Sequence, residues 1–145
     1  MGEYKKILVV VDLNADSDRV VERAKSIAAN YQSEIQLLHV VEYIPLEPIG
    51  ETLLPTIQIE NELVQRATVK LGELAEKLGL AHCQRRVLAG SIKAEIIRAA
   101  QEQHVDLIVL GSRERHGLAI LVNFTDDTVL HQAPCDILAV RLQKK

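Results

Sequence analysis

Polar residues suited to binding a nucleotide or an anion follow two of the apolar runs in this sequence. Val11 and Asp12 close the first run, and Gly111, Ser112 and Arg113 close the fourth. A glycine lets the backbone approach a phosphate group closely, backbone amides at a helix N-terminus bind anions, and an arginine can hold an anion by two parallel hydrogen bonds. These residues predict a nucleotide or anion site if the fold brings the two segments together.

The sequence motifs of common enzymes and metal sites are missing. There is no Gly-x-x-x-x-Gly-Lys phosphate loop, no Gly-x-Ser-x-Gly nucleophile elbow and no His-Glu-x-x-His motif. The histidines have no mutual ligand spacing; they are His39, His82, His104, His116 and His131. We therefore expect no catalytic residues and no metal, and a slow ATPase activity is the remaining enzymatic alternative.

Composition narrows the choice of partners and compartment. The net charge of -3, without a contiguous Lys/Arg cluster, argues against nucleic acid. Cys83 and Cys135 form no Cys-x-x-Cys pair and fall in segments with the pattern of buried strands, which favours a reduced, cytoplasmic chain. The apolar run of the N-terminal segment is too short for a secretion signal, so we expect neither export nor membrane anchoring.

Five short apolar runs alternate with helical patterns. The runs cover residues 7–11, 35–41, 83–88, 105–110 and 137–140. Helical spacing of apolar residues predicts a helix capped at Ser17, a second ending before Gly79, a third after Ser91, and a fourth over 118–129. The connection from 42 to 55 carries three prolines and is expected to be irregular and functional or mobile.

This alternation predicts the α/β class. Right-handed crossovers give a single doubly wound, five-stranded parallel sheet of order 3-2-1-4-5 with four helices, as one domain over residues 1–145. Ligands of such sheets bind outside the carboxyl ends of the strands, where the winding reverses. Here that crevice lies between strands one and four, with Val41 of strand two nearby.

Five segments, in order and spacing, resemble the universal stress protein family. They are KKILVVVDLNADSDRVVERAKSIA, LLHVVE, the pair Gly90-Ser91 before a helix, VDLIVLGSRERHG and APCDILAVR, and together they cover nearly the whole chain. The resemblance implies an adenine nucleotide alpha hydrolase-like fold, a stress-response role and homodimers. It also implies that the residue at Asp12 lies beside adenine in members that bind ATP.

The family contains members that bind ATP and members that do not. The resemblance implies a phosphate cradle of three glycines, of which this chain keeps only Gly111: Glu114 and Phe124 occupy the other two positions, and Thr125 follows. Shifting the later count by one residue brings Asn123 there, and Gly117 stands three places late. Losing two charge-assisted contacts weakens binding by roughly two to four decades. The sequence therefore predicts the branch that does not bind ATP, with no cofactor expected and ATP or AMP bound weakly if at all.

Two positions keep alternative interpretations. Arg113, Arg115 and His116 either form a solvated polar loop or grip an anion by their side chains. Asp12 is either a nucleotide contact or a turn residue that starts the first helix. We set aside a receiver-type phosphoacceptor, because it needs an aspartate at the end of strand three, where Gly90 stands.

The fifth strand is expected at the edge of the sheet with neither face polar. Its residues are Ile137, Leu138, Ala139 and Val140. An exposed apolar edge aggregates unless it is covered or paired. A homodimer through this strand is the favoured solution, and cover by the chain's own 142–145 tail is the alternative. We thus expect a non-enzymatic protein acting through its dimer surfaces, its 42–55 connection and a protein partner that the sequence does not identify.

Overall fold

The computed structural model describes residues 4–13, 16–42, 53–112 and 133–141. The elements are β1 (Lys6–Val10), α1 (Ser17–Tyr31), β2 (Glu34–Glu42), α2 (Leu53–Lys77), β3 (Gln84–Gly90), α3 (Ile92–Glu102), β4 (Leu107–Ser112) and β5 (Asp136–Arg141). The fourth predicted helix, over 118–129, lies outside the described residues, as does most of the 42–55 connection.

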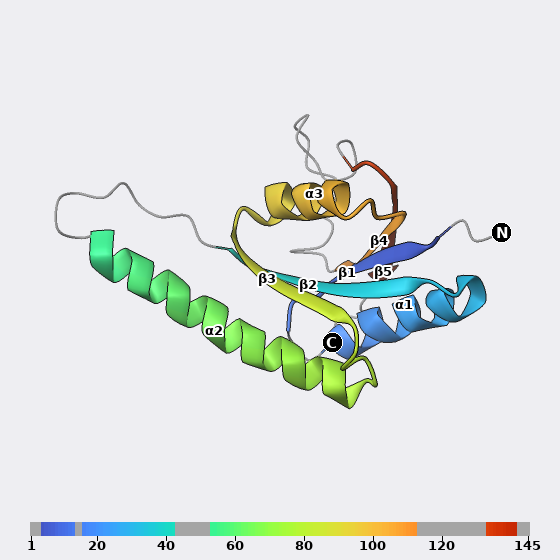
Figure 1. Cartoon of the computed structure of the whole chain (residues 1–145), viewed down its shortest axis with the longest axis horizontal. Coiled ribbons are helices and arrows are strands. Elements are labelled where there is room, and N and C mark those ends of the chain that lie inside the picture. The colour runs from blue at the N-terminus through green and yellow to red at the C-terminus, as the bar shows by residue number, and fades with distance from the viewer. Residues whose placement is uncertain (1–3, 14–15, 43–52, 113–132, 142–145) are drawn as a thin grey trace.

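The five strands form one parallel sheet of order β3-β2-β1-β4-β5, which confirms the predicted topology. Helices α1 and α2 cover one face and α3 lies on the other (Figure 1). Strands β3 and β5 are the two edges of the sheet. The polar sequence of β3 fits an edge position, and β5 was expected at the other edge. The chain therefore winds outward from β1 in both directions.

Buried aliphatic residues fill both faces of the central strands. Ile7, Val9 and Val109 pack with α1 and α2, whereas Leu8 and Ile108 pack with α3. Alternate residues of a strand point to opposite faces, so a strand covered on both sides must be apolar throughout. The continuous apolar runs in β1 and β4 therefore reflect burial on both faces of the sheet.

Local sequence signals explain some of the helix ends. The Ser91 hydroxyl accepts a hydrogen bond from the Ala94 amide and caps α3, as predicted. Gly79 follows α2 with φ at +76°, a conformation that favours glycine. The predicted cap at Ser17 is wrong: Asp16 is the N-cap residue and Ser17, 3% exposed, begins the helix.

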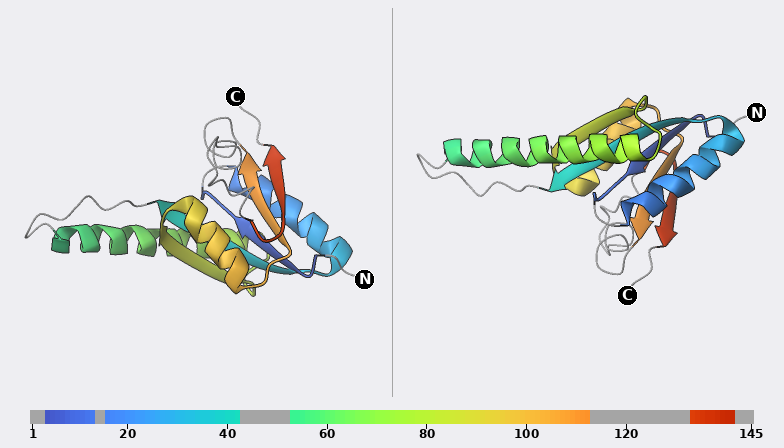
Figure 2. Two further views of the ribbon diagram at one scale, coloured as in Figure 1. Left: turned by 90° about the horizontal axis from the view of Figure 1, so that it is seen from above. Right: turned by 90° about the horizontal axis from the view of Figure 1, so that it is seen from below.

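Pro55 lies inside α2, not in the irregular connection where the sequence pattern placed it. The helix begins at Leu53, so Pro55 occupies its first turn, where no backbone N–H partner within the helix is needed. The amino-terminal part of this helix extends beyond the sheet, as both views in Figure 2 show. Proline is thus a signal for the start of this helix.

Candidate functional site at the carboxyl edge of the sheet

The reversal of winding, where the sequence predicts a crevice, lies at the end of β1. Val10 pairs with Leu38 of β2 on one side and with Leu110 of β4 on the other. Val11 follows directly and is 2% exposed, and its amide donates to the Leu38 carbonyl at 2.9 Å. The chain then leaves the sheet towards α1.

Asp12 and Leu13 form the turn between β1 and α1. Asp12 is exposed, and Leu13 has φ at +65°, which is uncommon for a residue with a side chain. Leu13 is half-buried against the core beneath α1 and α2. Strained backbone persists only where packing holds it, and it is enriched at functional sites.

The other predicted residues of the crevice are spread along the same edge. Gly111 and Ser112 end β4, the neighbour of β1, and on their other side they pair with Val140 and Arg141 of β5. Val41 lies on the part of β2 that continues past β1, paired with Ala89 of β3. The structure therefore brings Val11, Asp12 and Gly111 near one another, while Val41 stands further along the edge.

The loop that follows β4 lies outside the described residues. It holds Arg113, Arg115 and Thr125, together with Glu114 and Phe124 at the glycine positions. Binding of a nucleotide or an anion at this loop and at the crevice stays a prediction.

One residue at this edge was missed by the sequence analysis. His39 of β2 places its Nδ1 2.7 Å from the Val11 carbonyl oxygen and is half-buried. No sequence motif marks this role of His39, because its partner is a backbone atom 28 residues away. The exit of β1 is thus held by a side chain as well as by the sheet.

A hollow of about 310 Å³ lies between α1 and the carboxyl end of β5. Its lining residues are Asp18, Arg19, Glu22, Arg23 and Val140. Two carboxylates offset the two arginines, and Asp18 is further paired with Lys77 at 2.8 Å. The lining of this hollow thus mixes charges of both signs.

Both cysteines lie one residue before a strand and are half-buried, rather than within buried strands as the sequence pattern indicated. Burial, with Asp136 and Asp106 nearby, raises the pKa of the Cys135 thiol to about 11. Burial also raises the pKa of Cys83. Within the described ranges, no cluster of His, Cys, Asp or Glu could hold a metal ion, and no helix is long and apolar enough to span a membrane.

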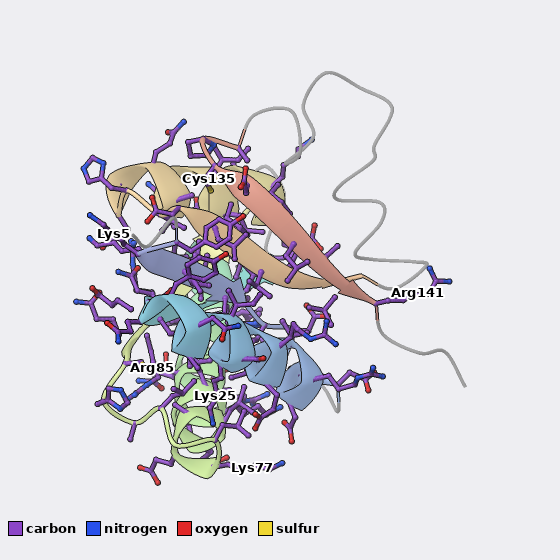
Figure 3. The ribbon with its side chains drawn as sticks, turned by 90° about the vertical axis from the view of Figure 1, so that its right-hand side faces the viewer. Lys5, Lys25, Lys77, Arg85, Cys135 and Arg141 are labelled. Carbon is purple, nitrogen blue, oxygen red and sulfur yellow. The ribbon has the colours of Figure 1, made fainter. Side chains whose placement is uncertain are left out.

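The edge strand β5 faces the viewer in Figure 3, between the labelled Cys135 and Arg141. Ile137 and Leu138 are half-buried, Ala139 is exposed and Val140 is buried. Its inner edge pairs with β4 over six residues. The predicted position of β5 at the sheet edge is confirmed.

Known proteins resemble the chain over nearly its full length. Universal stress protein A homolog 2 of Coxiella burnetii is 37% identical over 144 residues, covering 99% of both chains. A solved universal stress protein from Lactobacillus plantarum superposes with a TM-score of 0.76 at 23% identity, covering 95% of this chain and 98% of that one. A solved universal stress protein in complex with cAMP superposes with a TM-score of 0.59 at 21% identity, covering 94% and 96%.

The sequence model of the universal stress protein family matches residues 3–141. The sheet order and the relatives that match end to end agree with it. The chain belongs to the universal stress protein family.

Proposed function

We propose that the chain is a cytoplasmic, non-enzymatic stress-resistance or regulatory protein that works as a homodimer and binds nucleotides weakly at most. Membership of the universal stress protein family supports the stress-related role. Two parts of this proposal need testing: the homodimer and the weak binding of nucleotides at the crevice.

The outer edge of β5 carries the dimer proposal. Among the described strands β5 pairs only with β4, and on it Ala139 is exposed while Ile137 and Leu138 are half-buried, so this edge offers a strand for pairing with apolar side chains beside it. A second copy related by a twofold axis would pair the same strand antiparallel and cover the edge with an identical surface. Charge at the centre of the strand should oppose that pairing.

Sedimentation equilibrium of Ala139→Arg tests the dimer. We expect the wild type to be dimeric at micromolar concentration and the variant to dissociate at least about tenfold more readily, since two added cations would face each other across the axis. Gln84→Arg places the same charge on the exposed start of the opposite edge, β3, and should leave the dimer unchanged. A monomeric wild type, or an Ala139→Arg protein as dimeric as the wild type, contradicts the proposal.

At the crevice we expect nucleotides to bind weakly, because backbone groups at the strand ends are present but the glycine cradle for the phosphates is not. Val11, Asp12 and Gly111 lie at the edge where doubly wound sheets bind ligands. In the sequence, Glu114 and Phe124 stand where close phosphate contact requires glycine, and Glu114 adds a negative charge. Nucleotide phosphates would thus lose amide contacts and meet a carboxylate.

A second candidate is a nucleotide-binding member with an altered phosphate loop. The solved universal stress protein in complex with cAMP supports it, because that protein shares this fold. In this chain Arg113 and Arg115 would replace the missing glycine contacts, and Thr125 would complete the site. If this candidate is correct, Arg113→Ala should abolish micromolar ATP binding, whereas Arg98→Ala, on the exposed side of α3, should not.

A further inference from the structure

The imidazole of His39 contacts the backbone at the point where the chain leaves β1. Its Nδ1 lies 2.7 Å from the carbonyl oxygen of Val11. A carbonyl oxygen only accepts hydrogen bonds, so Nδ1 carries the proton. The neutral ring is therefore the Nδ1–H tautomer.

This bond begins where the ladder between β1 and β2 stops. The last register pair is Val10 with Leu38, and the Val11 amide makes one further bond to the Leu38 carbonyl at 2.9 Å. The Val11 carbonyl oxygen then accepts the hydrogen bond from Nδ1 of His39. One residue is thus held through both its donor and its acceptor at the point where the strand leaves the sheet.

The carbonyl of Val11 belongs to the same rigid peptide unit as the amide of Asp12. In a planar trans peptide the C=O and N–H groups point in opposite directions. With the carbonyl drawn towards β2, the Asp12 amide is directed to the other side of β1, where β4 lies. The His39 bond therefore fixes how Asp12 enters the crevice.

Leu13 secures the far side of the same turn. Its φ of +65° is costly for a residue with a side chain, and its half-buried side chain packs on the core. Asp12 is the only residue between the His39 bond and this anchored position. Little rotational freedom remains for it while both hold.

We propose that His39 is a positioning residue, which sets the orientation of the Val11–Asp12 peptide at the crevice by donating from Nδ1. The inference rests on the proposed use of this crevice as the ligand site. Its structural consequence can be measured without a ligand.

The first test is the tautomer and the local backbone, both by NMR. In the full chain, ¹⁵N spectra should show His39 protonated at Nδ1. The Val11 amide should exchange at least about fivefold faster in His39→Leu than in the wild type, because a hydrogen bond next to it is lost. An Nε2–H ring, or unchanged Val11, Asp12 and Leu13 amides in His39→Leu, overturns the proposal.

Two further variants separate a donor role from a packing role. In His39→Asn, an amide nitrogen occupies about the same place as Nδ1, so the Val11 amide should keep its wild-type exchange rate. His82→Asn alters an exposed histidine near Cys83 and should change nothing at this turn. If His39→Asn behaves as His39→Leu, His39 acts by packing and the proposal is wrong.

Titration with AMP at millimolar concentration distinguishes failure of this inference from failure of the crevice as a ligand site. If AMP binds weakly, His39→Leu should bind at least about fivefold more weakly, and His39→Asn as well as the wild type. Equal affinity of all three overturns the positioning role even though binding occurs. If the wild type binds no AMP, the crevice is not the ligand site, and the NMR result alone decides what His39 does.

Discussion

The Asp106 carboxylate accepts a hydrogen bond from the Lys5 backbone amide, with its Oδ2 2.8 Å from that nitrogen. The same oxygen lies 3.0 Å from the Lys6 amide, and the Asp106 amide donates to the Lys6 carbonyl. One side chain just before β4 thus holds the start of β1, although the two are 101 residues apart. The amino ends of the two central strands are fixed here, opposite the crevice.

Removal of this carboxylate should destabilise the fold. Asp106→Ala leaves two backbone amides without their acceptor, and we expect a loss of about 2 kcal/mol in the free energy of unfolding. Asp106→Asn keeps one acceptor oxygen and should lose less. Urea denaturation checks both, and Asp106→Ala within the error of the wild type would show that these hydrogen bonds contribute nothing.

Two glycine substitutions should change stability in opposite directions. Gly90 has φ at +145°, and a Cβ there would lie 3.1 Å from Glu95 Oε2, so Gly90→Ala should lose about 1 to 3 kcal/mol. Gly72 lies inside α2, and an added Cβ would meet no atom within 4 Å, so Gly72→Ala should gain about 0.5 to 1 kcal/mol. Thermal unfolding measures both, and a stable Gly90→Ala contradicts the turn geometry.

The Cys135 thiol should react slowly at neutral pH. Burial raises its pKa from 9.0 to about 11, and the thiolate is the reactive form. In Cys83→Ser, which leaves only Cys135, the thiolate fraction at pH 8 should be about one hundredfold lower than in free cysteine, so alkylation should be up to about one hundredfold slower, and the rate should rise towards pH 11. Alkylation as fast as that of free cysteine would mean that the thiol is not desolvated.

The same shift affects stability at high pH. The folded state binds the Cys135 proton more tightly than the unfolded state does. Its contribution to stability is therefore complete below about pH 9 and is lost as pH rises through about 11. Cys135→Ser should lack that part of the alkaline decline, which denaturant titrations from pH 8 to 11 can measure.

The sheet order could be predicted from the sequence because its cause is local and repeated. Apolar runs alternate with amphipathic helices, and Ser91 and Gly79 mark helix ends by their own chemistry. Pro55 misled the prediction, since proline marks both an irregular loop and a helix start. The contacts of Asp106 and His39 could not be predicted, because each joins a side chain to a backbone atom distant in sequence.

The reversal of winding, where the crevice is expected, could be predicted from the topology. Val11 and Gly111 each follow the last register pair of β1 and β4, and they lie close only because these two strands are neighbours, which alternating strands and helices require. The half-buried state of Cys135 was not predictable from its apolar surroundings, since it depends on exactly where β5 begins.

Isothermal titration of the wild type with ATP and with AMP, with Mg²⁺ present, measures directly whether the crevice binds nucleotides. We expect no saturable heat below about millimolar ligand, because two glycine contacts of the phosphate cradle are replaced. Micromolar binding that Arg113→Ala abolishes would contradict it and establish the nucleotide-binding alternative.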